Sequence, residues 1–194
     1  MTTDSPPRLL LGVSGGIAAY KACEIASAMV KAGWQVRVAM TPSATQFVGP
    51  LTFEALTNHP VMTNALATGH TAGESAVEHV AWARWADVFC VAPMTASLLG
   101  RFACGIADDA LSTVHLALEP RVPVVLCPAM NTQMWEHPVV QRNLKWLDEL
   151  GRYRLIAPVE KRLACGDVGV GGLAEVSDIT AQLRALKLTR TLAS

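Results

Sequence analysis

Two short turns carry small and hydroxyl-bearing residues that suit the binding of a phosphate group. Ser14, Gly15 and Gly16 follow one apolar run, and Thr41 and Ser43 follow another. Backbone N–H groups at the start of a helix attract anions, and glycines let a ligand approach them closely. Two such turns side by side favour a mononucleotide phosphate, although the same residues would also serve simply to form the turns and cap the helices.

The first of these turns, "GVSGGIAAYK", matches neither common nucleotide-binding loop. Ser14 and Ile17 stand where a dinucleotide-binding fingerprint has its second and third glycines. Lys21 is not followed by Ser or Thr and does not follow the required Gly, which excludes a Walker A loop.

One cysteine and one histidine have surroundings that suit reactivity. Cys165 lies in "KRLACGDVGVGG", where cations precede it and glycines follow. Positive neighbours and exposure make a thiol reactive, and a glycine-rich flap can act as a lid. His79 lies in "EHVAWARWAD". The structural alternatives are a surface cysteine without function and a half-buried, hydrogen-bonded histidine.

The stretch "PAMNTQMW" (128–135) is unusual for its position. It directly follows the apolar run "VPVVLC", where most loops are short and small. This one instead carries the Asn131 amide, the Met134 thioether and the Trp135 indole. Side chains of this kind at the end of a buried strand mark a candidate ligand-binding loop.

The order of apolar runs predicts an α/β fold. Continuous apolar runs, typical of strands buried on both faces, alternate with helical patterns, which indicates one doubly wound, Rossmann-like parallel sheet with helices on both faces. Ligands bind such sheets outside the carboxyl ends of the strands, where the loops 14–16, 41–43, 93–97 and 128–135 would lie. The expected strands are 8–13, 34–40, 87–92, 122–127 and 153–157.

The remaining segments complete a single domain over residues 8–187. A surface loop is expected over 58–76, a flexible flap over about 160–175, and disordered ends at 1–7 and 188–194. The expected helices are 17–33, 50–57, 75–86, 93–118 in two pieces broken near Gly105, 137–151 and 177–187.

Composition excludes several classes of protein. The 194 residues are 51% hydrophobic and 16% charged with zero net charge, so nothing favours nucleic acid, and no apolar run is long enough for a membrane span. The N-terminus lacks the pattern of a signal peptide, so we expect a cytoplasmic protein. The surplus of apolar residues favours a homo-oligomer.

The cysteines argue against a metal site. Their number is odd and none forms a C-x-x-C pair, so neither a disulfide framework nor a zinc site is expected. Four of them, Cys23, Cys90, Cys104 and Cys127, are expected to be small core residues, as is His115 within an apolar helix.

Taken together, "SGGIAAYK", "EHVAWARWAD", "PAMNTQMW" and "KRLACGD" resemble the flavin-dependent cysteine decarboxylases over about residues 8–180. The pattern P-x-M-N-x-x-M-W is a signature of that family. The resemblance is greatest to the branch that acts on phosphopantothenoylcysteine, and it implies bound FMN and homotrimers, sometimes assembled into dodecamers. It also implies that any synthetase partner is a separate protein, since the chain ends at Ser194.

The resemblance assigns roles to individual residues. His79 would act as the catalytic base, Asn131 would hold the substrate carboxylate, and Cys165 would donate a proton in the final reduction. Substrate contacts are also implied for Met134, Arg162 and Ala164. The flavin-contacting positions would be Ser14, Gly15, Gly16, Ile17, Thr41, Ser43, Thr95, Ser97 and Ala129.

One departure from the family lies in "TASL" (95–98). Ser97 and Leu98 stand where many relatives have Asn and Thr. Because Ser97 keeps a hydroxyl, we expect flavin binding to be retained.

The implied chemistry explains the residue types. A cysteinyl carboxylate has no electron sink, and a flavin supplies one by accepting a hydride equivalent from the side chain. An amide such as Asn131 would orient the carboxylate for loss of CO₂, and Met134 and Trp135 would form an apolar wall.

Two alternatives remain open. One is a peptidyl-cysteine decarboxylase that forms a C-terminal aminoenethiol on a ribosomal peptide precursor. The other is a flavin-binding regulatory subunit without turnover.

Overall fold

A computed structural model describes residues 5–64, 78–162 and 168–191, with side chains up to residue 186. Its centre is a six-stranded sheet in the order β3-β2-β1-β4-β5-β6, and every neighbouring pair is parallel. This confirms the predicted doubly wound fold. The strands are β1 (Arg8–Val13), β2 (Gln35–Met40), β3 (Val61–Met62), β4 (Val88–Met94), β5 (Val124–Pro128) and β6 (Tyr153–Leu155).

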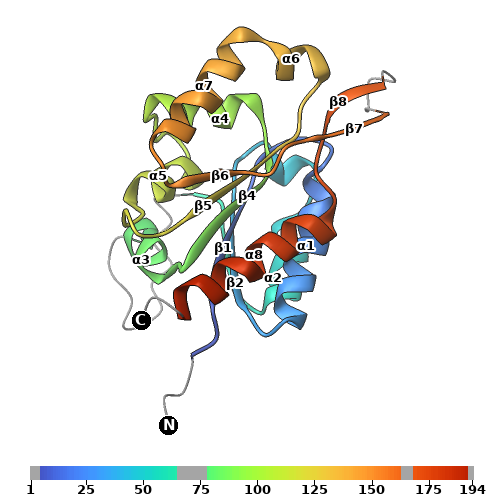
Figure 1. The fold of residues 1–194 in the computed structure, drawn as a ribbon. Helices are drawn as coiled ribbons and strands as arrows, with labels where there is room; N and C mark the ends of the chain where they lie inside the picture. The colour runs from blue at the N-terminus through green and yellow to red at the C-terminus, as the bar shows by residue number, and fades with distance from the viewer. Residues whose placement is uncertain (1–4, 65–77, 163–167, 192–194) are drawn as a thin grey trace.

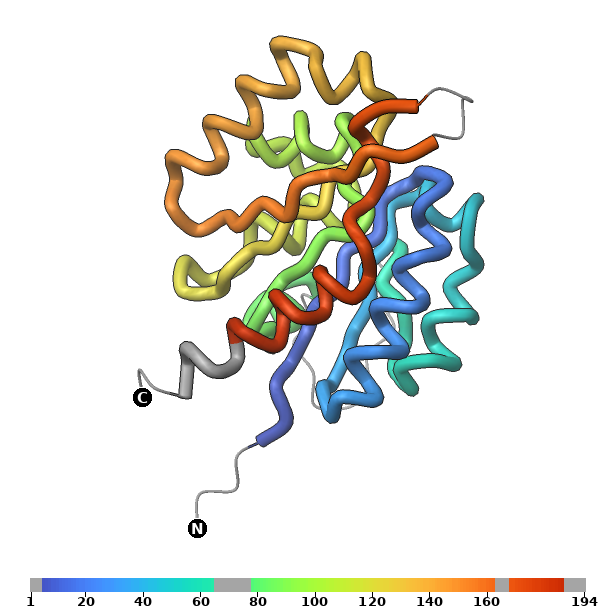
Figure 2. The backbone as a smooth tube through the Cα atoms, turned by 45° about the vertical axis from the view of Figure 1, so that its right-hand side comes forward, coloured from blue at the N-terminus to red at the C-terminus, as the bar shows by residue number. Residues whose placement is uncertain are grey.

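Helices cover both faces of the sheet (Figure 1). One face is covered by α1 (Ala19–Lys31), α2 (Pro50–Thr57) and α8 (Val176–Thr191). The other is covered by α3 (Glu78–Trp85), α4 (Ala96–Cys104), α5 (Ala110–Ala117) and α7 (Pro138–Glu149). Each face has its own apolar core, and the tube in Figure 2 shows the sheet lying between the two layers.

Local sequence explains where the central elements begin and end. Every residue of β4 is buried, as expected for a continuous apolar run covered on both sides. Gly105 adopts a left-handed φ of 68° and ends α4, and the Asp109 carboxylate then caps α5 with Ser112. The predicted break near Gly105 is therefore confirmed.

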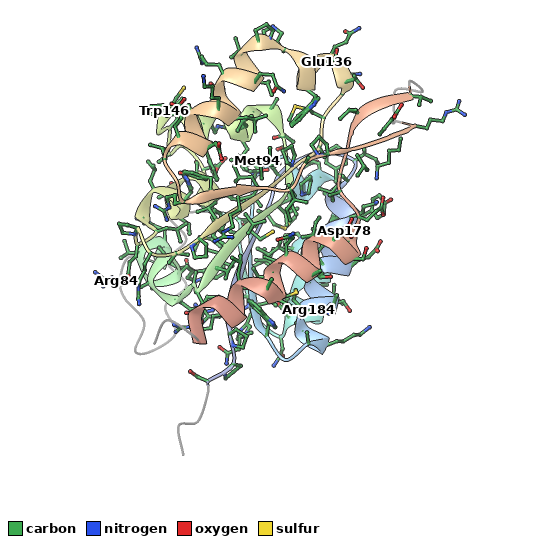
Figure 3. The ribbon with its side chains drawn as sticks, viewed as in Figure 1. Arg84, Met94, Glu136, Trp146, Asp178 and Arg184 are labelled. Carbon is green, nitrogen blue, oxygen red and sulfur yellow. The ribbon has the colours of Figure 1, made fainter. Side chains whose placement is uncertain are left out.

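Figure 3 shows the contrast between the core and the surface. Met94, at the end of β4, lies fully buried in the middle of the molecule. Glu136, Trp146 and Asp178 lie on the outer helices, and Trp146 is 48% exposed. Within the described ranges, no helix has the length and apolar character needed to cross a bilayer.

Several elements differ from those expected. The loop "PAMNTQMW" contains a short helix, α6 (Thr132–Glu136), and the expected loop after α2 contains β3. The glycine-rich flap forms an antiparallel hairpin of β7 (Val159–Arg162) and β8 (Val168–Gly172). The final helix α8 extends to Thr191, beyond its predicted end. Ladder hydrogen bonds, which local periodicity does not reveal, order the hairpin.

The four cysteines that were expected in the core differ in burial. Cys90 and Cys127 are buried, and Cys23 is half-buried. Cys104 is exposed, so the prediction that it lies in the core was wrong. It occupies the last position of α4, where the chain turns outward at Gly105.

His115 is a core residue, as predicted. Its ring stacks on Phe102 with the ring centroids 3.6 Å apart, and its Nε2 lies 2.8 Å from the Tyr153 hydroxyl. Burial, followed by the charge of Arg152, lowers the pKa of His115 from 6.5 to about 3. The imidazole is therefore neutral at neutral pH.

This burial makes stability depend on pH. Between pH 6.5 and 3 the imidazole of His115 is protonated in the unfolded chain and neutral in the folded chain. The free energy of unfolding therefore falls as the pH decreases towards 3. His115→Phe removes the group that binds this proton. We therefore expect the free energy of unfolding to depend less steeply on pH in this variant, by about 1.4 kcal/mol per pH unit. Urea unfolding at several pH values measures it. Tyr153→Phe, which leaves the histidine in place, should retain the slope; an equal slope in wild type and His115→Phe would contradict this assignment.

Candidate functional site: a pocket at the carboxyl ends of the strands

A pocket of about 860 Å³ opens where β1, β2, β4 and β5 end. Strand order reverses between β1 and β4, so the pocket occupies the position at which doubly wound sheets bind their ligands. The turns after these four strands form its walls, together with the β7–β8 hairpin. The site residues used below that line it are Ser14, Gly15, Gly16, Ile17, Lys21, Thr41, Ser43, Thr95, Ser97, Arg101, Ala129, Asn131, Met134, Lys161 and Arg162.

Ser14 joins the ends of the two central strands. Its hydroxyl donates to the Pro93 carbonyl at 2.8 Å and accepts from the Thr95 N–H at 3.0 Å. It also lies 3.2 Å from the Thr95 hydroxyl. With only 1% of its surface exposed, Ser14 holds the turn after β1 against the turn after β4 and fixes the floor of the pocket.

The turn after β1 also packs closely against the turn after β2. A Cβ added at Gly15 would lie 2.7 Å from the Ser43 carbonyl carbon and still closer to the Ser43 side chain. Buried Thr41 accepts the Ala44 N–H at 3.2 Å, and its hydroxyl lies 3.1 Å from the Ser43 hydroxyl. The chain after Ser43 forms a single 3-10 turn, Ala44–Gln46. The two predicted hydroxyl turns therefore share one wall.

A second wall begins at α4. Thr95 is the N-cap of this helix, and its hydroxyl accepts the Leu98 N–H at 3.4 Å. Ser97 is exposed in the pocket, whereas Leu98 is fully buried in the core beneath it. The departure from the family at Leu98 therefore also supplies packing, and Ser97 keeps its hydroxyl on the pocket side.

Asn131 and Met134 extend over the pocket from α6. Asn131 caps this helix, and its Oδ1 accepts the Gln133 N–H at 2.8 Å. This bond directs the acceptor end of the amide to the helix, so the opposite end of the amide carries its donor hydrogens. Met134 is 47% exposed and lines the same pocket. An amide beside a thioether is what the sequence predicted for this loop.

Trp135 does not join that wall, so this prediction was wrong. Its indole packs against the apolar core under α7 and lines a separate cavity of about 350 Å³ beside Tyr153. The cause is the helix α6: successive residues of a helix point about 100° apart, so Met134 and Trp135 cannot share a face.

Every charged side chain that lines the pocket within the described ranges is a cation: Lys21, Arg101, Lys161 and Arg162. Arg101 is neutralised by Asp108 at 2.9 Å and Asp109 at 3.1 Å. The other three lie on the side of α1 and the hairpin. A chain with zero net charge thus lines this pocket, within the described residues, with cationic side chains and no acidic ones, which suits anionic ligands.

The pocket fits a flavin mononucleotide. The glycine turn Ser14–Gly16 and the hydroxyls of Thr41 and Ser43 suit its phosphate, and the volume and apolar lining of the pocket suit a flat ring system. The close approach of Gly15 to Ser43 brings these two turns together at the pocket, and only a glycine allows it. Within the described residues, no three His, Cys, Asp or Glu side chains are grouped so that they could hold a metal ion.

Three of the predicted catalytic and substrate residues are not placed in this pocket. His79 lies in the first turn of α3, away from the lining residues, and its Nδ1 is buried without a hydrogen-bond partner. Ala164 and Cys165 lie outside the described residues. Arg162, at the end of β7, does line the pocket.

Sequence reasoning missed Lys21, Arg101 and Lys161. All three line the pocket, but each stands in a stretch where a basic residue ordinarily faces solvent. For Lys21 the signal was its place one turn after the glycine turn. For Lys161 it was its place in the basic start of the flap.

Comparison with known proteins agrees with this geometry. The model of the Flavoprotein family matches residues 1–187. The coenzyme A biosynthesis bifunctional protein CoaBC of Bacillus subtilis is 49% identical over 171 residues, which are 88% of this chain and 41% of that protein. A probable phosphopantothenoylcysteine decarboxylase of Streptococcus mutans is 42% identical over 172 residues, 89% of this chain and 94% of that protein.

Solved structures show the same fold. A mutant PPC decarboxylase complexed with pantothenoylaminoethenethiol has a TM-score of 0.81 and 36% identity, covering 93% of this chain and 97% of that one. The FMN-dependent cysteine decarboxylase SpaF has a TM-score of 0.77 and 35% identity, covering 94% of this chain and 98% of that one.

The chain belongs to the Flavoprotein family. Within that family its similarity is to the FMN-dependent cysteine decarboxylases, which confirms the predicted resemblance. It spans about two fifths of the length of the bifunctional relatives that it matches.

Proposed function

We propose that this chain catalyses the FMN-dependent oxidative decarboxylation of phosphopantothenoylcysteine to phosphopantetheine, a step in coenzyme A biosynthesis. The observation that carries the proposal is the composition of the one pocket at the switch point. A phosphate cradle, an amide donor and a purely cationic set of charged side chains converge there. The substrate carries a carboxylate and a phosphate, and the cofactor carries another phosphate.

FMN, when bound, supplies the electron sink that accepts two electrons from the cysteine side chain and later returns them. The family match and the FMN-dependent structural neighbour support this cofactor. In this chain Ser14, Gly15, Thr41 and Ser43 would hold the phosphate, and Ile17, Thr95, Ser97 and Ala129 would contact the remainder.

The chain's own residues handle the carboxylate and the protons. The amide hydrogens of Asn131 hold the cysteinyl carboxylate, and Met134 keeps water away as CO₂ leaves. His79 accepts the proton released when the thiol is oxidised. Cys165 returns a proton to the carbon chain when the enethiol is reduced, so substrate and product differ by CO₂ alone.

The products distinguish this function from the peptide alternative. The protein would be incubated with phosphopantothenoylcysteine and, separately, with a peptide ending in cysteine, and the products weighed by mass spectrometry. We expect the small thiol to lose CO₂ alone, and Cys165→Ser to leave it short of two further hydrogens. Loss of CO₂ and two hydrogens from the peptide, with the small thiol unchanged, would refute the proposal.

The position of His79 supports a homo-oligomer, a trimer or a set of trimers. Because His79 lies outside its own chain's pocket, it can act only if another copy presents it there. The composition agrees, since large apolar side chains such as Ile17, Tyr20, Phe47 and Leu51 are more than half exposed.

Mixing two inactive variants tests this arrangement. His79→Asn keeps an intact pocket, and Asn131→Asp, whose carboxylate repels the substrate, keeps an intact histidine. When the two variants are co-expressed, about half of the sites have an intact pocket, and about half of those receive an intact His79 from another chain. We therefore expect roughly a quarter of wild-type activity. Each variant alone should be yellow and inactive. Mixed oligomers without any recovered activity would show that one chain supplies both groups.

A further inference from the structure

Two lysines share one carboxylate at the base of the β7–β8 hairpin. Lys21 Nζ, from α1, lies 3.8 Å from Glu175 Oε2. Lys161 Nζ, from β7, lies 3.6 Å from Glu175 Oε1. Both lysines line the pocket and Glu175 does not, so one positive charge facing the pocket is uncompensated.

A glycine lets Lys161 reach this position. Its side chain crosses Gly172 so closely that a Cβ there would lie 2.8 Å from Lys161 Cδ and closer still to Cε. Any side chain at position 172 would therefore displace the lysine. The ammonium group is then fixed by donating to the Leu173 carbonyl at 2.9 Å. An ammonium has three donors, and these contacts use two of them.

The lysine pair has the electrostatics of an anion site. Burial, then the neighbouring Lys21 ammonium, lowers the pKa of Lys161, while Glu175 acts in the opposite direction. Lys21 is mostly enclosed, with 17% of its side chain exposed. Two cations held this close with one carboxylate gain from a doubly charged anion that accepts a hydrogen bond from each.

We propose that Lys21 and Lys161 bind the phosphate end of the substrate and make the enzyme specific for a phosphorylated thiol. The ligand class is a phosphomonoester dianion. Two ligands proposed for this pocket, the cofactor and the substrate, each carry such a group. The cofactor's phosphate already has the cradle at Ser14–Gly16. Lys161 instead stands beside Arg162, on the hairpin that leads to the predicted substrate-contacting positions.

This proposal rests on the proposed function, and binding of the product separates the two. Isothermal titration of the flavin-loaded protein would compare phosphopantetheine with pantetheine, which lacks the phosphate. We expect wild type to bind the phosphorylated form at least about tenfold more tightly. Lys161→Gln should remove most of this preference and leave pantetheine binding unchanged. Lys145→Gln, which disrupts a lysine–glutamate pair on the exposed side of α7, should retain this preference.

Other results of this titration would overturn either the phosphate subsite or the proposed function. Equal binding of the two thiols by wild type, or a preference that survives Lys161→Gln, would overturn the subsite. Loss of FMN from Lys161→Gln with the phosphate preference intact would assign the lysine to the cofactor and also overturn it. A phosphate preference that depends on Lys161, in a protein that does not decarboxylate phosphopantothenoylcysteine, would uphold the subsite and refute the proposed function.

Discussion

The convergence of three turns at one edge of the sheet is the constraint on which the site depends. The hydroxyl of Ser14 holds the end of β1 to the end of β4, and Gly15 brings the same turn against Ser43 after β2. These contacts involve small residues, and they fix the positions of the three turns relative to one another. The helices and the hairpin are then placed around this floor.

Much of the fold follows from sequence because its signals are local. β1, β4 and β5 are continuous apolar runs, and α4 and α5 are separated at Gly105, whose left-handed backbone ends a helix. The β7–β8 hairpin could not be predicted in this way. Its glycines lack any strand signal, and its order comes from ladder pairing between residues such as Lys161 and Gly169.

The site residues likewise differ in whether local sequence predicts their positions. The turns at Ser14–Gly16, Thr41 and Thr95 were predictable because chain order places them at strand ends. The direction of Trp135 was not, since it depends on the phase of a one-turn helix. The role of Lys161 was not predictable either, because only the fold reveals that its side chain crosses Gly172. His79 is recognisable in the sequence, yet its own chain does not bring it to the pocket.

The close-packed turn at Gly15 is inferred to form the phosphate cradle of FMN. Titration of the apoprotein with FMN, followed by flavin fluorescence, tests it directly in Gly15→Ala, with Gly49→Ala as the control because a Cβ there meets nothing within 4 Å. We expect FMN to bind at least about tenfold more weakly to folded Gly15→Ala, equal to about 1.4 kcal/mol, and with unchanged affinity to Gly49→Ala. Equal FMN affinity in Gly15→Ala and wild type would contradict it.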